Sequence, residues 1–266
     1  QPNAMGGREV GGMATMLAAH LDFGDEPAHQ LLSDFWQTRR LTKTPGLTAI
    51  EMFDQVATGK IKAIWIMATN PVASLPESNK IKQALAKCPL VIVSEVFETS
   101  ETLQFADVIL PARAWGEKSG TVTNSERRIS RQRVFKPAFG QAKPDWWIIA
   151  EVAKAMGFGK AFDYHNEAQI FQEHARLSVL ASKHSGSFNI TGLSTMDQQQ
   201  YDRMSPVQWP QPDFDVIKLQ DIRLFADGKY FTADGRPNLV SVSFKPAEVD
   251  PDLILNTGRN RDQWHT

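Results

Sequence analysis

The stretch IKAIWIM at residues 61–67 is an almost continuous apolar run, and it leads directly into a polar corner that ends at Asn70 and Pro71. A run without alternation of apolar and polar residues is typical of a strand covered on both faces, as in a parallel α/β sheet. Pro71 has no backbone N–H with which to extend a strand. We therefore predict a buried strand over residues 61–67, followed by a polar corner that contains Asn70.

Helical periodicity flanks this strand on both sides. Before it lies LTAIEMFDQVATGK, in which Thr48 is suited to cap a helix and Gly59 to end it. After it, SNKIKQALAKC predicts a second helix with Ser78 as its candidate cap, followed at once by a strand at 90–93. These elements predict a right-handed βαβ unit, to which residues 108–110 add a third strand.

Polar residues follow the predicted strands. Asn70 follows the first strand, and Ser94 and Glu95 close the second, so all three are expected at one edge of the sheet. Ligands of open parallel sheets collect outside the carboxyl ends of the strands, where an acidic residue commonly holds a sugar or a base N–H. Ser94 and Glu95 are equally suited to cap the short helix that begins near Glu98.

The first twenty residues combine glycines with a charged pair. Two Gly-Gly pairs, at residues 6–7 and 11–12, flank Arg8 and Glu9, and an apolar-periodic stretch follows at 13–21. Dense glycine lets a backbone approach a ligand closely. The pattern also fits a flexible loop before a helix, which the spacing alone favours.

A basic stretch follows the third strand. Residues 115–133 hold Lys118 and four arginines, a set that can wrap anionic phosphates but is also typical of a solvated surface. Asp145 then precedes the amphipathic stretch WWIIAEVAKAMGFG as its candidate cap, and Gly157 is its candidate end.

Beyond residue 157 the chain is more polar. Helical patterns cover 167–177 and 196–203, and the proline-rich SPVQWPQPD at 205–213 is expected to cross the surface. Ala-Asp-Gly triplets that begin at Ala226 and Ala233 predict hairpin turns, and alternation at 240–244 predicts a half-buried strand. We expect an α/β domain of three layers (α/β/α) with a parallel sheet over about 1–157, and a smaller mixed α+β extension over 158–252.

Composition excludes several classes of protein. The chain has 266 residues, of which 42% are hydrophobic, and its net charge of −1 gives no electrostatic case for nucleic acid or an anionic membrane. Its apolar runs are far shorter than the roughly 20 residues of a membrane-spanning helix. Cys88 is the single cysteine, which excludes an internal disulfide or an all-cysteine metal site, and it is read as a buried structural thiol. Histidines show no HExxH spacing, and GxSxG, Walker and GxGxxG motifs are absent from the sequence.

Four blocks carry a resemblance to a known family. They are QPNAMGGREVGG, IMATNPVASLP, ADVILPARAWGEKSGTVTNSERRISRQR and LNTGRNRDQWHT, in collinear order along nearly the whole chain. Together they resemble the molybdopterin-guanine-dinucleotide oxidoreductases, and within them they are most similar to the catalytic subunits of bacterial assimilatory nitrate reductases.

The resemblance implies roles for particular residues. Asn70, Ser94 and Glu95 would contact a nucleotide at the sheet edge, although the family commonly has Asp where this chain has Glu95. Lys118 and Asp145 would complete that pocket. Residues 253–266 match the truncated start of the family's last domain, which lies along the pterin cofactor. The residues of this motif are Thr257, Gly258, Arg259, Trp264, His265 and Thr266.

Two further residues match positions near the molybdenum in related nitrate reductases, Gln1 and Arg8. A fixed guanidinium at Arg8 would steer nitrate to the metal and stabilise charge on the departing oxygen.

The resemblance also implies cofactors and partners for a longer parent protein, of which this chain would be an internal fragment. These are a molybdenum-bis(molybdopterin guanine dinucleotide) cofactor, a 4Fe-4S cluster in a preceding segment, nitrate as substrate, and an electron-donor protein or reductase subunit, in the cytoplasm. The implied reaction is oxygen-atom transfer from nitrate, and the fragment alone is expected to be inactive, with a mobile stub over 253–266.

Two alternatives stay open. One is a related molybdenum enzyme such as a formate dehydrogenase, because one fold supports several chemistries. The other is a non-catalytic nucleotide-binding module that has lost the metal.

Overall fold

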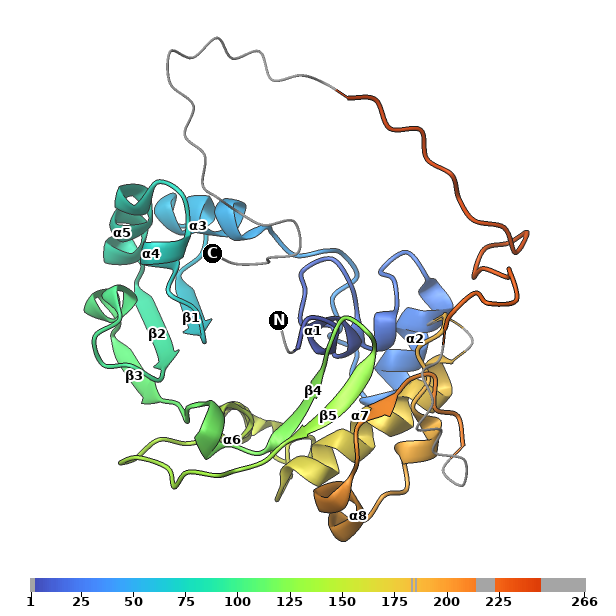
Figure 1. The fold of residues 1–266 in the computed structure, drawn as a ribbon. Coiled ribbons are helices and arrows are strands. Elements are labelled where there is room, and N and C mark those ends of the chain that lie inside the picture. The colour runs from blue at the N-terminus through green and yellow to red at the C-terminus, as the bar shows by residue number, and fades with distance from the viewer. Residues whose placement is uncertain (1–2, 183, 185, 214–222, 245–266) are drawn as a thin grey trace.

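A computed structural model of the chain describes residues 3–182, 184, 186–213 and 223–244. Two sheets organise them, one parallel and one antiparallel, each with its own set of helices (Figure 1). The predicted cofactor segment at 253–266 and Gln1 lie outside the described residues.

The parallel sheet is built from β1 (Ala63–Met67), β2 (Leu90–Glu95) and β3 (Val108–Pro111), in that order. Helices α3 (Ala49–Ala57), α4 (Pro71–Ser74) and α5 (Ser78–Lys87) lie on its outer side, and a 3-10 helix, η2 (Glu101–Phe105), precedes β3 (Figure 1). This arrangement confirms the predicted α/β class and parallel sheet. Its core contains Phe53, Val56, Ile64, Ile66, Val72, Ile81, Leu85, Val91 and Val93.

The two faces of this sheet differ in burial. Trp65, Ile92 and Val108 are aligned across the three strands and share one face, yet the first two are only half-buried and Val108 is 40% exposed. The unbroken apolar run predicted cover on both faces, whereas burial alternates along β1. On this half-buried face the indole N–H of Trp65 donates to Ser94 Oγ at 2.9 Å, so its polar group has a partner within the sheet.

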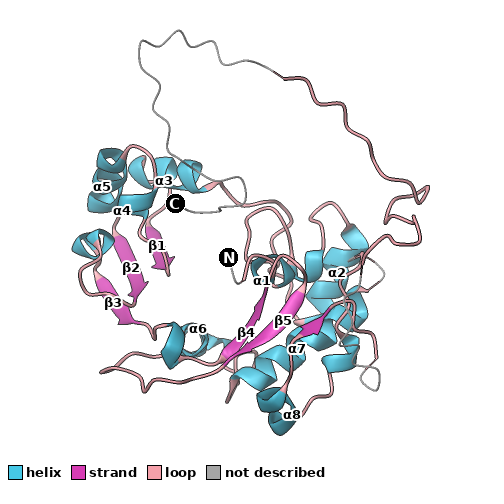
Figure 2. Ribbon diagram, viewed as in Figure 1, coloured by secondary structure: helices cyan, strands magenta, loops and turns pink. Residues whose placement is uncertain are grey.

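The antiparallel sheet consists of β4 (Gly120–Thr123), β5 (Arg128–Gln132) and the short β6 (Val207–Gln208). Figure 2 shows helices gathered beside it: α1 (Gly6–Glu9), α2 (Glu26–Phe35), α7 (Glu167–Ala181) and α8 (Gln198–Arg203). Two 3-10 helices, η1 (Ala18–His20) and η5 (Thr191–Leu193), complete this group. Their shared core includes Leu21, Leu32, Ile129, Phe188, Ile190, Leu193, Tyr201 and Trp209.

The two cores do not follow the order of the chain. The core of the antiparallel sheet joins residues 17–32 to Ile129 and to residues 168–209, while the core of the parallel sheet draws on residues 53–93. Between them run η3 (Trp115–Glu117), α6 (Asp145–Ala153) and a π-helical turn, η4 (Lys154–Phe158), in which Gly157 has a φ of 91°. The division at residue 157 therefore stays a prediction.

Three predicted elements differ from the structure. The periodic stretch 13–21 forms only η1, because Ala19 and His20 have left-handed backbones with φ of 57° and 60°. The proline-rich connector does not cross the surface, since Trp209 and Gln211 are each only 2% exposed. Residues 240–244 form no strand, and Val240 and Val242 are more than 80% exposed.

The Ala-Asp-Gly triplets do form turns, with φ of 71° at Gly228 and 70° at Gly235, but no strands flank them in the described residues. Ser78 is not the cap of α5: Glu77 holds that position, and the Ser78 hydroxyl donates to the Val72 carbonyl.

Helix α3 has the cap that the sequence predicts. The Thr48 hydroxyl accepts from the Glu51 N–H, and the Glu51 carboxylate accepts from the Thr48 N–H, which is a capping box. We expect Thr48→Ala to lower the free energy of unfolding by about 0.5–2 kcal/mol, because it removes this cap. Urea unfolding of the chain measures the change, and Thr44→Ala, at an exposed position before the helix, serves as the control. Equal midpoints for both variants would contradict the prediction.

Candidate functional site

Asn70, Ser94 and Glu95 lie at the carboxyl edge of the parallel sheet, as predicted from their order after β1 and β2. The side-chain amide of Asn70, however, forms hydrogen bonds to other residues of the chain through both its nitrogen and its oxygen. Its Nδ2 donates to Glu101 Oε2 at 2.5 Å, and its Oδ1 accepts from Thr102 Oγ1 at 2.7 Å. The hydrogen bond from Asn70 lowers the pKa of Glu101. Asn70 therefore ties the end of β1 to η2.

Ser94 and Glu95 differ in the hydrogen-bond acceptors that they leave available to a ligand. Ser94 is buried, and its hydroxyl accepts from Trp65. Glu95 Oε1 accepts from the backbone N–H groups of Val96 and Phe97, at 2.7 and 3.4 Å. Its second oxygen, Oε2, has no hydrogen bond to the described residues. Glu95 thus keeps an acceptor at the sheet edge.

Lys118 and Asp145, which the resemblance assigns to the nucleotide pocket, form an ion pair with 2.8 Å between Lys118 Nζ and Asp145 Oδ2; their part in a pocket stays a prediction. Both side chains are about one-third exposed, at 27% and 30%. Asp145 does not cap α6; it is the first residue of that helix, after Pro144. A parallel bridge between Ala112 and Lys143 carries the start of α6 to the sheet edge, since the Ala112 N–H also bonds Glu95 O.

Arg8 lies in a pocket separate from the edge of the parallel sheet. It lines a pocket of about 330 Å³ with Met5, Met16, His20, Ser125, Arg127, Trp209 and Leu224. Arg127 Nε donates to the Trp209 carbonyl at 3.1 Å, its guanidinium lies 5.5 Å from the centre of the Trp209 ring, and burial lowers its pKa. Two guanidinium groups and a hydroxyl around one pocket suit a small anion.

Sequence reasoning missed His20, Arg127 and Trp209 as members of this pocket. Arg127 belongs to the basic run, for which the sequence allows either phosphate binding or a solvated surface, and Trp209 belongs to the connector that the sequence predicts at the surface. A tryptophan between two prolines was the one available signal, because so large an apolar side chain is seldom left in water.

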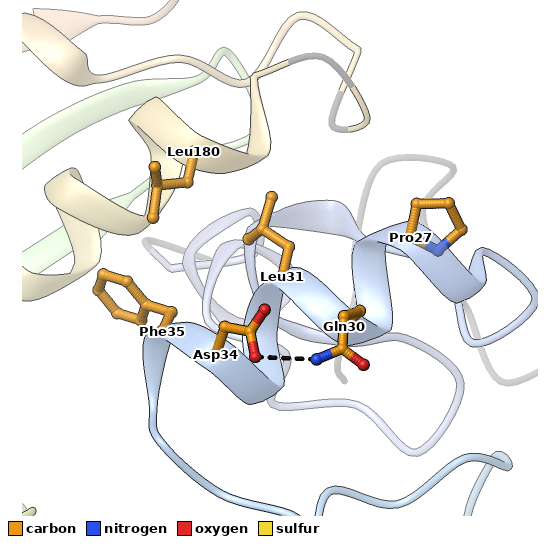
Figure 3. A pocket seen from close by; sticks show the side chains of 6 residues that line it. All are labelled: Pro27, Gln30, Leu31, Asp34, Phe35 and Leu180. Atoms are coloured by element: carbon orange, nitrogen blue, oxygen red, sulfur yellow. Dashed lines mark hydrogen bonds between the residues drawn. The ribbon is translucent and has the colours of Figure 1, made fainter.

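A second pocket, of about 620 Å³, lies between α2 and α7 (Figure 3). Among its six lining residues Asp34 is the ionisable one, and it already accepts from Gln30 Nε2 at 2.8 Å. The remaining side chains, Pro27, Leu31, Phe35 and Leu180, are apolar. This pocket offers no cationic group for an anion.

No group of three or more His, Cys, Asp or Glu side chains in the described ranges is arranged to hold a metal ion. Cys88 is buried beside β2, where its Sγ contacts the Leu90 carbonyl oxygen at 3.4 Å, in agreement with a structural thiol. None of the helices in those ranges is both long and apolar enough to cross a bilayer.

Comparison with known proteins gives these sites a context. A protein-family model described as molybdopterin oxidoreductase matches residues 3–155, a range that contains Arg8 and every predicted residue of the sheet edge. The chain belongs to this family.

Relatives of this molybdopterin oxidoreductase chain include nitrate reductases. It is 53% identical over its whole length to a nitrate reductase of Shewanella frigidimarina and 49% identical to one of Klebsiella oxytoca. It is also 30% identical to the F420-dependent formate dehydrogenase subunit alpha of Methanocaldococcus jannaschii. The chain spans 29%, 30% and 37% of the lengths of these relatives.

A solved structure supports the fold. Acetylene hydratase from Pelobacter acetylenicus matches 70% of this molybdopterin oxidoreductase chain and 23% of its own chain, with a TM-score of 0.51 and 20% sequence identity. At this identity the likeness concerns the fold alone.

Membership of the family implies a molybdenum–pterin cofactor. Acceptors and a positive charge are present at the predicted edge. Glu95 Oε2 and Asp145 Oδ1 are carboxylate oxygens able to accept hydrogen bonds, and Lys118 Nζ is a charged donor beside Asp145. Asn70 and Ser94 have a structural part in the same edge.

The Asn70 bridge generates a pH-dependent prediction. Asn70→Asp would place a second carboxylate beside Glu101, so at pH 7 the two negative charges repel and lower the thermal midpoint. Protonation of one carboxyl at acid pH removes the repulsion, so the difference from wild type should shrink on acidification. The lowered pKa of Glu101 acts in the same direction, because the stability that it adds to wild type is present at neutral pH and lost as pH falls through that pKa.

Thermal unfolding between about pH 3 and pH 7 measures this difference. The double variant Asn70→Asp/Glu101→Gln is the matched control, since it removes the pair of charges. A deficit that stays constant with pH would contradict the role of the carboxylate pair.

Proposed function

We propose that the polypeptide to which this chain belongs reduces nitrate to nitrite, and that this chain contributes to binding its molybdenum cofactor. The observation that carries the proposal is the identity of 53% and 49% over the whole chain to proteins named nitrate reductase. The formate dehydrogenase relative is 30% identical, which makes it the weaker alternative. The assimilatory role and the cytoplasmic location belong to the same proposal.

The cofactor in this proposal is molybdenum-bis(molybdopterin guanine dinucleotide). When bound, it supplies the oxygen-atom transfer and two-electron chemistry that convert nitrate and two protons to nitrite and water. A 4Fe-4S cluster and an electron-donor protein or reductase subunit, both outside this chain, would deliver those electrons.

The residues of this chain would act by binding and orientation. Arg8 would donate a charge-assisted hydrogen bond to the nitrate anion and hold it toward the metal, and Gln1 is the second candidate for this role. At the sheet edge, Glu95 and Asp145 would accept hydrogen bonds from one guanine nucleotide and Lys118 would face its phosphates, with Asn70 and Ser94 fixing the edge. Thr257, Gly258, Arg259, Trp264, His265 and Thr266 would continue the cofactor site.

The role of Arg8 is tested in the full-length enzyme. Arg8→Gln should lower kcat/KM for nitrate roughly 10- to 100-fold, the effect of losing a charged hydrogen bond worth about 1.5–3 kcal/mol. Steady-state nitrate reduction measures it, and Arg40→Gln, at an exposed arginine, should leave it unchanged. Equal values for wild type and Arg8→Gln would exclude Arg8 from substrate binding.

The role of Asp145 is tested by the amount of bound cofactor. Asp145→Asn keeps the shape of the side chain but removes its charge, so we expect the guanine nucleotide released on denaturation to fall about tenfold under limiting cofactor. The fold should persist, because a partly exposed ion pair contributes only about 0–1 kcal/mol.

Asp163→Asn, at an exposed aspartate, is the matched control. Full nucleotide content in purified Asp145→Asn would show that the sheet edge does not bind the nucleotide through this residue.

A further inference from the structure

Glu9 is a buried carboxylate directly beside Arg8 in the sequence, and only 3% of its surface is exposed. Its Oε1 accepts from the indole N–H of Trp209 at 2.6 Å, and its Oε2 accepts from the Thr123 hydroxyl at 2.9 Å. A buried carboxylate is strongly destabilising unless such partners replace its water. These two hydrogen bonds therefore define where Glu9 lies.

Thr123 holds the same segment at two further points. Its N–H donates to Asn3 Oδ1 at 3.0 Å, and its carbonyl accepts from the Met5 N–H at 3.1 Å. Gly6 permits this close approach, because a Cβ at that position would come within 1.9 Å of Asn3 Oδ1. Residues 3–9 are thus fastened to the end of β4 on both sides of Gly6.

The other wall of this site is aromatic. His174 Nε2 lies 3.7 Å from Glu9 Oε2, and Phe188 stacks between His174 and His20, with ring centres at 5.5 and 5.1 Å. Trp209 meets Phe188 edge-on at 5.4 Å. Burial lowers the pKa of His20. His20 also has the left-handed backbone noted above, and strained residues of this kind gather at functional sites.

Arg8 and Glu9 point into different surroundings from one short helix. Glu9 is enclosed by the core, whereas Arg8 is exposed and lines the pocket that it shares with His20 and Trp209. Trp209 therefore contributes both to the wall of the pocket and to the hydrogen bond that fixes Glu9. Any movement of Glu9 moves its neighbour Arg8 relative to that wall.

We propose that Glu9 is a positioning residue: its hydrogen bonds to Thr123 and Trp209 hold the segment that carries Arg8, so that the Arg8 guanidinium faces its pocket. This inference rests on the proposed function, in which Arg8 binds nitrate. Glu9 acts through Arg8 and does not touch the substrate.

The experiment uses the full-length enzyme and two substitutions at Glu9. Glu9→Leu removes both hydrogen bonds and should lower kcat/KM for nitrate about 10- to 100-fold, the range expected for a displacement of about 1 Å in a binding group. Glu9→Gln should stay within about threefold of wild type, because its amide oxygen accepts from Trp209 while the Thr123 hydroxyl turns to accept from its nitrogen.

A double-mutant cycle separates positioning from general stability. In an Arg8→Gln background, Glu9→Leu should cause little further loss, because the group that it positions is already gone. An equal loss in both backgrounds would overturn the proposal and leave Glu9 a purely structural residue. Should Glu9→Leu fail to fold, Trp209→Phe and Thr123→Val each remove one of the two bonds and are placed in the same cycle.

Amide hydrogen exchange supplies a readout that does not depend on activity. The amides of residues 5–12 should lose protection in Glu9→Leu and keep it in Glu9→Gln, and unchanged protection in Glu9→Leu would overturn the proposal. A wild-type enzyme that reduces no nitrate would contradict the proposed function instead, and the exchange result would still decide whether Glu9 holds this segment.

Discussion

The buried carboxylate of Glu9 is the interaction on which the antiparallel half of the structure depends. It joins residues 200 positions apart, since its partner Trp209 lies just after β6 and its other partner, Thr123, ends β4. A charge in a dry interior is tolerated only when its hydrogen bonds are complete. The N-terminal segment, β4 and the segment after β6 must therefore come together as one unit.

This requirement explains why the chain is not organised in consecutive pieces. The residues before α3 pack with those after α6, and the parallel sheet with its helices is formed by the sequence between them. Arg8 and the carboxylates of the sheet edge consequently stand on two different cores. In the proposed enzyme, one core presents a guanidinium to the substrate and the other presents acceptors to a nucleotide.

Local patterns accounted for much of the parallel half. The capping box at Thr48, the strand that ends before Asn70 and the second strand that ends at Glu95 all depend on neighbours within a few residues. The order of β1 and β2 then sufficed to place Asn70, Ser94 and Glu95 at one edge. The family resemblance assigned Lys118 and Asp145 to one pocket, but their ion pair was not predicted, because no local rule connects side chains 27 residues apart.

The failures have a common physical cause. Periodicity at 13–21 indicates a helix, but tertiary packing holds Ala19 and His20 in left-handed conformations that no pattern of apolar residues encodes. The prolines around Trp209 suggest an exposed connector, yet its indole is buried against Phe188 and Glu9. Asn70 is predicted to bind a ligand through its amide, but the amide N–H instead donates to Glu101, 31 positions away. Each outcome depends on a distant partner.

The half-open face of the parallel sheet has a practical consequence. Trp65, Ile92 and Val108 line one side of β1, β2 and β3, and the described helices cover the opposite side. Parallel sheets are normally sheltered on both sides, and an apolar surface left in water promotes adhesion between molecules. Ligand titrations on these 266 residues therefore require a dilution series, which separates ligand binding from self-association, before any stoichiometry is assigned.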